Sequence, residues 1–78
     1  MATQTLGSRM RQLRQERAFT LLTLASAAGI SVSYLNDIEH DRTVPTLGRL
    51  GDLAKALDVS VRELLTGVHP YDSPAGKP

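Results

Sequence analysis

The chain has 78 residues, of which 41% are hydrophobic and 22% are charged, and it contains no cysteine. These properties favour one small domain and exclude a disordered chain, a disulfide scaffold and a thiolate zinc site. No apolar run approaches the ~18 residues that a membrane helix needs, and the first residues show no signal-peptide pattern. We therefore expect a soluble, cytoplasmic protein that does not contact a membrane.

The net charge of +1 is unevenly distributed. Residues 1–18 contain four arginines and one glutamate, whereas residues 19–41 contain three acidic residues and no lysine or arginine. An arginine-rich helix is suited to a phosphate backbone. A solvated helix face is the more ordinary explanation, and charge alone favours it.

The chain begins with two predicted helices. The first spans about Thr3 to Arg17 and has an apolar face. The second follows Thr20, a good N-cap residue, and runs to Ala28. Gly29 then provides the left-handed position that commonly ends a helix. The apolar positions of the first face are Leu6, Met10 and Leu13.

A third helix is predicted from its N-cap Ser31 to about His40, with Leu35 and Ile38 pointing inward. A fourth follows the N-cap Thr46 and continues to about Leu57. Its expected core face contains Leu47, Leu50, Leu53, Ala54 and Leu57.

A short fifth helix is predicted where Ser60 and Glu63 form a capping box, and Gly67 closes it. The sequence therefore indicates an all-α, compact five-helix domain over residues 1–67. Residues 68–78 form a tail without periodicity, which we expect to be partly disordered.

The tight connection between the second and third helices is the most informative feature. Gly29 ends one helix and Ser31 caps the next, so the two helices must cross steeply, as in a helix-turn-helix. Ala25 lies where they cross, and its small side chain lets the backbones approach. The outer face of the third helix is then Val32, Ser33, Asn36, Asp37 and His40.

This outer face is short and polar, and its side chains suit base edges in a major groove. Asn pairs with adenine, Val contacts a thymine methyl group, Asp accepts from the cytosine amino group, and Ser pairs with several bases. A plain helical corner with a polar outside is the alternative. The residue types favour DNA reading.

From Leu6 to Gly67 the chain resembles the Cro/CI-type helix-turn-helix proteins, the XRE family. The matching stretches are Arg11 to Arg14, Thr20 to Ala25, Gly29 to Ser31, Tyr34-Leu35, Ile38-Glu39, Arg42 to Leu47, Leu53 to Leu57 and Val59 to Leu65. Ser31 to Leu35, Asp37, Glu39, Arg42-Thr43 and Pro45 are also similar to the DNA-damage-response repressors of radiation-resistant bacteria. The resemblance implies a lambda-repressor-like fold and a sequence-specific transcriptional regulator of duplex DNA, acting as a repressor.

The resemblance also implies residue roles. Val32, Ser33 and Asp37 occupy base-facing positions, with Asn36 nearby. Thr20, Ser31, Arg42, Thr43 and Thr46 occupy places where relatives touch phosphates. Arg14 and Glu39 match a pair that forms an internal salt bridge. Replacing Ser33 or Asp37 is therefore expected to change sequence preference, whereas replacing Arg42 is expected to weaken all sequences about equally.

Two positions depart from the family pattern. Leu21 stands where relatives usually have Gln, a residue that contacts phosphate and braces a base-reading side chain. Asp41 stands where relatives often have Gly in a left-handed conformation, which Asp tolerates better than most residues. Together with Asp37, Asp41 makes the surface weakly cationic, so we expect modest affinity for a single subunit.

A homodimer on a palindromic operator is the family's usual geometry. The expected dimer surface is the fifth helix with residues 68–71, through Val61, Leu65, Val68 and Tyr71. Closure of the core is an equally good explanation for Val61 and Leu65.

Two other functions remain as alternatives. The two histidines, His40 and His69, lie in no metal-ligand spacing or nucleophile motif, so we expect no enzyme activity, no metal and no cofactor. An antitoxin or a protein-interaction adaptor is the stronger alternative, because the same fold serves both.

Overall fold

The computed structural model describes residues 4–68. These residues form five helices in the predicted order. The helices are α1 (Leu6–Glu16), α2 (Leu21–Ala28), α3 (Val32–Glu39), α4 (Leu47–Ala56) and α5 (Val61–Leu64). The all-α prediction is confirmed, and α2 to α5 lie within a few residues of their expected bounds.

Each helix begins at a serine or threonine whose side-chain oxygen accepts a hydrogen bond from the amide three residues later. The five caps are Thr5, Thr20, Ser31, Thr46 and Ser60. Such caps satisfy amides that the helix itself leaves without a partner. The start predicted at Thr3 was too early, because Thr5 is the residue that caps Ser8.

The core is aliphatic and draws on all five helices. Its fully buried large side chains are Met10, Leu24, Leu35, Ile38, Leu53, Leu57, Leu64 and Val68. The sequence prediction was wrong at Leu47, which is 75% exposed. Leu47 keeps the helical spacing of the core residues, but it is the first residue of α4, and its neighbours Thr46, Gly48 and Arg49 are exposed as well.

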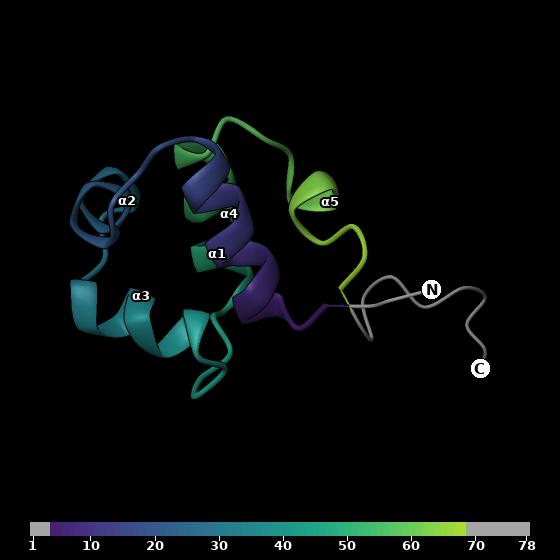
Figure 1. Cartoon of the computed structure of the whole chain (residues 1–78), viewed down its shortest axis with the longest axis horizontal. Coiled ribbons are helices and arrows are strands. Elements are labelled where there is room, and N and C mark those ends of the chain that lie inside the picture. The colour runs from purple at the N-terminus through teal and green to yellow at the C-terminus, as the bar shows by residue number, and fades with distance from the viewer. Residues whose placement is uncertain (1–3, 69–78) are drawn as a thin grey trace.

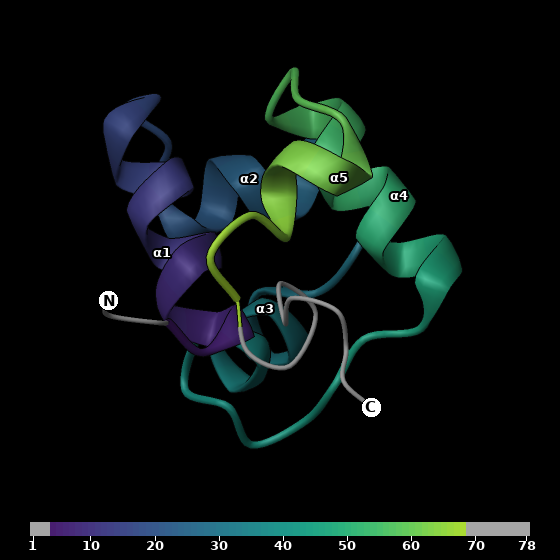
Figure 2. The same cartoon turned by 90° about the vertical axis from the view of Figure 1, so that its right-hand side faces the viewer.

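The helices enclose this core with α2 and α3 at one end of the molecule (Figure 1). The helix α2 packs against α3 and α4, and α1 packs against α3 and α5. The view turned by 90° shows α1 and α4 on either side of α5, with α2 and α3 behind (Figure 2).

The two ends of the described chain meet on the side of the molecule opposite α2 (Figure 1). Gln4 and Val68 form an isolated parallel bridge, and the Gln4 amide donates to the Gly67 carbonyl at 2.8 Å. Val68 is fully buried, so it belongs to the core rather than to the tail in which the sequence placed it.

A left-handed residue follows each of the five helices, and after α5 it is Gly67 (φ 80°), as predicted. Gly29 (φ 72°) and Asp41 (φ 59°) adopt this conformation as predicted. Ala18 (φ 60°) and Asp58 (φ 60°) also adopt it, although the sequence did not predict this. Within residues 4–68 no single helix is long and apolar enough to cross a membrane, although α2 and α3 taken together pass that test by length and composition.

Candidate nucleic-acid interface

The geometry of a helix-turn-helix is present in α2 and α3. The two helices are bent by 109° relative to each other. The Ile30 amide donates to the Ala25 carbonyl at 3.0 Å, so the turn folds directly onto the end of α2. Ala25 is only 1% exposed, as expected for a small side chain placed where two helices approach.

The outer face of α3 carries the side chains that the sequence assigned to base reading. Leu35 and Ile38 are buried and attach α3 to the core. The opposite side presents exposed or half-buried residues, namely Val32, Ser33, Asn36, Asp37 and His40. A short helix with one face packed on the core and a polar opposite face can enter a major groove.

Three of the proposed phosphate contacts are helix caps. Thr20, Ser31 and Thr46 are all exposed, and each accepts a hydrogen bond from an amide of its own helix. A hydroxyl has one donor and two acceptor positions, so capping leaves the hydroxyl proton of Ser31 and Thr46 for another partner. The Thr20 hydroxyl instead donates to Thr23 Oγ1 at 3.0 Å. The amide groups at these helix starts favour anions.

The remaining two proposed phosphate contacts lie in the connection from α3 to α4. Arg42 is exposed, and Thr43 is half-buried. Thr43 therefore offers less surface to a phosphate than the other residues in this set.

Arg14 and Glu39 form a bidentate salt bridge beneath this face. Arg14 Nε donates to Glu39 Oε2 at 2.6 Å, and Nη2 donates to Oε1 at 3.1 Å. Their side chains are 12% and 3% exposed. A further bond from Arg14 Nη1 reaches the Phe19 carbonyl at 2.9 Å, so this arginine ties α1 to α3 and to the start of α2.

A second ion pair, which sequence reasoning missed, joins two residues assigned to DNA. Arg42 Nε donates to Asp37 Oδ1 at 2.9 Å. The two side chains are about half exposed. An acid and an arginine five positions apart across a helix end have no periodic signature, so the sequence gives no sign of this contact.

Asp41 also has a structural partner. Its Oδ1 accepts a hydrogen bond from the Gly7 amide at 2.9 Å, in the first turn of α1. The positive end of the α1 dipole lies there and favours a carboxylate.

Each of the three acids in residues 19–41 therefore has a compensating partner. Glu39 pairs with Arg14, Asp37 pairs with Arg42, and Asp41 faces the amide end of α1. The net charge of residues 19–41 alone is therefore more negative than the local charge that a DNA phosphate would meet.

The Leu21 position is apolar and partly turned inward. Leu21 is half-buried against the core, whereas its neighbour Leu22 is 63% exposed. Neither side chain can replace the amide of the Gln that is usual in the family. The start of α2 therefore offers a phosphate the hydroxyl groups of Thr20 and Thr23 and backbone amides, but no side-chain amide.

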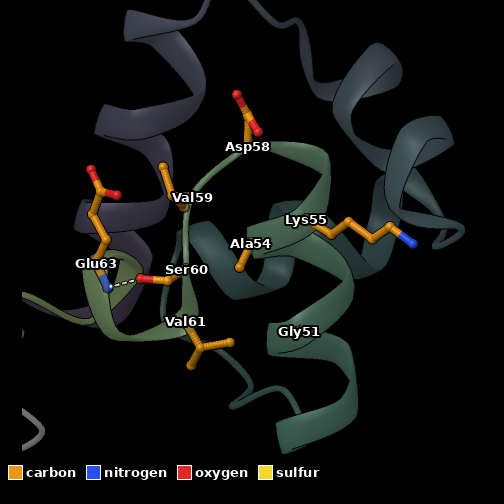
Figure 3. A pocket seen from close by; sticks show the side chains of 8 residues that line it. All are labelled: Gly51, Ala54, Lys55, Asp58, Val59, Ser60, Val61 and Glu63. Atoms are coloured by element: carbon orange, nitrogen blue, oxygen red, sulfur yellow. Dashed lines mark hydrogen bonds between the residues drawn. The ribbon is translucent and has the colours of Figure 1, made fainter.

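The surface predicted for dimerisation lies at α5. Val61 and Leu65 are half-buried against the core, so closure of the core accounts for part of their apolar character. Residues of α4 and of the α5 segment line an open pocket, in which Val61 lies beside Gly51 while the side chains of Lys55 and Glu63 point away from each other (Figure 3). The buried Val68 contributes nothing to an outer surface, and Tyr71 lies outside the described residues.

No cluster of three or more His, Cys, Asp or Glu side chains suited to a metal occurs among residues 4–68. The histidine on α3, His40, places Nδ1 2.9 Å from the Asn36 carbonyl. This contact lies within the last turn of α3, so His40 has a local partner at the end of its own helix.

Known proteins resemble the chain over most of its length. A curated relative, the HTH-type transcriptional regulator DdrOP3 of Deinococcus deserti, is 49% identical over 72 residues, covering 91% of this chain. The chain spans 56% of that relative, 42% of the immunity repressor protein of Bacillus phage phi105 and 59% of SinR of Bacillus subtilis.

Solved structures of DNA complexes share the fold. SinR, described as the master regulator for biofilm formation and bound to DNA, matches with a TM-score of 0.74 and 40% identity, over 78% of this chain and 98% of that chain. The P22 c2 repressor bound to a synthetic operator matches with a TM-score of 0.76 and 32% identity, over 83% and 98%. The helix-turn-helix family model matches residues 10–64. The chain therefore belongs to the XRE family of helix-turn-helix proteins.

Proposed function

We propose that this chain is a sequence-specific transcriptional repressor that binds duplex DNA as a homodimer in the cytoplasm. The observation that carries the proposal is the outer face of α3, which is polar and accessible, while Leu35 and Ile38 hold the helix from behind. Related chains of the same fold have been solved on DNA, which supports the same use here.

In the proposed complex, α3 lies in the major groove. Val32, Ser33, Asn36 and Asp37 contact base edges. Thr20, Ser31, Arg42, Thr43 and Thr46 contact phosphates on either side. Arg14 and Glu39 hold α1 against α3 from behind and do not contact bases.

Two subunits would place their recognition helices about 34–36 Å apart, one turn of DNA, and so read a palindrome. The open pocket between α4 and α5 lies on the surface where the second subunit is expected. Sedimentation equilibrium with and without operator DNA measures the number of subunits directly.

The test is selection of bound sequences from random DNA, followed by titration of the selected site at several salt concentrations. Affinity should fall by about 0.9 log unit per log unit of salt for each phosphate contact. The variant Ser33→Ala should shift the selected sequence without lowering the melting temperature. Absence of retained DNA at low salt, including fragments from upstream of its own gene, would contradict the proposal.

A further inference from the structure

The pair formed by Asp37 and Arg42 joins two residues with different proposed roles. Asp37 is assigned to a base, and Arg42 is assigned to a phosphate, yet the structure binds them to each other at 2.9 Å. The two roles are therefore physically linked.

The backbone at the end of α3 fixes this pair. Asp41 is left-handed, and the Arg42 amide donates to the Asp37 carbonyl at 2.9 Å. The Asp41 amide donates to the Ile38 carbonyl at 3.1 Å, which completes a Schellman-type helix end. The turn thus brings Arg42 back over the last turn of α3, and Asp37 binds both its main chain and its side chain.

The pair leaves hydrogen-bonding capacity on both partners. A guanidinium has five N–H donors, of which the Nε donor of Arg42 is directed to Asp37. The Arg42 side chain is 54% exposed, so its Nη groups can bind a further partner. Asp37 accepts at Oδ1, and its Oδ2 remains as an acceptor on a side chain that is 42% exposed.

Stability does not account for the pair. An ion pair this exposed contributes little to folding, because water solvates both charges. Exclusion of water by a bound DNA strengthens the same interaction. In the groove, the guanidinium also offsets the repulsion between the Asp37 carboxylate and the phosphates.

We propose that Arg42 is a specificity-determining residue. It holds the Asp37 carboxylate so that Oδ2 accepts from the amino group of a cytosine in the major groove, and its Nη groups bind a neighbouring phosphate. The inference rests on the proposed function above. It replaces the expectation from sequence that loss of Arg42 weakens all DNA sequences equally.

The test compares Arg42→Lys, Arg42→Ala, Asp37→Asn and the double variant Asp37→Asn with Arg42→Lys. Lysine keeps the charge for the phosphate but lacks the planar fork that can bind both partners. Each variant is titrated against the selected site and against sites with the cytosine pair replaced, at several salt concentrations. Circular dichroism and melting temperature confirm folding.

The wild type should select a cytosine at one position of each half-site and discriminate against replacements there by about tenfold or more. The variant Arg42→Lys should keep the salt slope and lose most of this discrimination. The variant Arg42→Ala should also reduce the salt slope by about 0.9. The variant Asp37→Asn should lose the same preference, and the double variant should lose no more than either single variant.

Arg49→Lys is the matched control. Arg49 is also a half-exposed arginine paired with an aspartate, Asp52, but both residues lie on α4. Its base preference should equal that of the wild type.

Retention of the cytosine preference by Arg42→Lys would overturn the inference and leave Arg42 as a phosphate contact alone. Additive losses in the double variant, or a site whose preference Asp37→Asn does not change, would overturn it as well. Failure of the proposed function looks different, because the wild type itself would then select no sequence.

Discussion

Asp41 ends α3 and at the same time caps the start of α1, through the 2.9 Å hydrogen bond from the Gly7 amide to its carboxylate. Gly7 lies directly against the end of α3, where a Cβ atom would meet the carbonyls of Ile38 and Glu39. This contact fixes the end of the recognition helix to the body of the domain, and it makes the pair a clear target for mutation.

The variant Gly7→Ala should destabilise the fold. Its Cβ would lie 2.6 Å from the Glu39 carbonyl oxygen and 2.8 Å from Asp41 Oδ1, so α1 and α3 must separate. We expect a loss of about 1–3 kcal/mol in the free energy of unfolding, measured by urea denaturation. Gly51→Ala is the control, because nothing lies within 4 Å of the added atom. It should stabilise α4 by up to about 1 kcal/mol.

The variant Asp41→Ala should also lose stability. It removes the acceptor of the Gly7 amide and places a side chain less tolerant of the left-handed region at φ 59°. A loss of about 1–2 kcal/mol follows in thermal or urea unfolding. Asp41→Asn keeps both the oxygen and the tolerance, so it should stay near the wild type. Equal losses in the two variants would show that the carboxylate charge, rather than the hydrogen bond, is what matters.

The variant Glu39→Ala should be the most damaging of the charge removals. It leaves the guanidinium of Arg14, only 12% exposed, without its carboxylate partner. Such a loss typically costs about 3–5 kcal/mol. Asp52→Ala breaks the exposed pair with Arg49 and should cost less than about 1 kcal/mol. Similar unfolding curves for both variants would contradict the bracing role of Glu39.

Replacing Ala18 by glycine should raise stability. Ala18 follows α1 with φ 60°, a conformation that a Cβ disfavours. Its backbone is already fixed by the hydrogen bond from its amide to the Gln15 carbonyl and by the bond from the Phe19 amide to the Arg14 carbonyl. Glycine should therefore increase the free energy of unfolding by about 0.5–1 kcal/mol, after the entropy that glycine loses on folding. An unchanged or lower melting temperature would contradict this.

The helices and the turn could be predicted because their signals are local. Caps such as Thr20 and Ser31 act within three residues, and Gly29 needs only its own backbone to turn left-handed. The left-handed Ala18 gave no such signal, because alanine is an ordinary helix residue. Leu47 was predicted wrongly for the opposite reason, since it has the helical spacing of the core residues but lies exposed in the first turn of α4.

The site could be predicted in its residue types but not in its pairings. The face of α3 follows from helical periodicity once Leu35 and Ile38 are placed inward. The contact of Asp37 with Arg42 depends on the turn after α3, and that of Asp41 with Gly7 spans 34 residues. Neither contact leaves a local pattern in the sequence, so both could be identified only from the structure.

The bridge between Gln4 and Val68 brings the two ends of the described chain together on the side of the molecule opposite α2 (Figure 1). The same closeness suits the domain to circular permutation, with a short linker across the old ends and new ends opened in a surface loop.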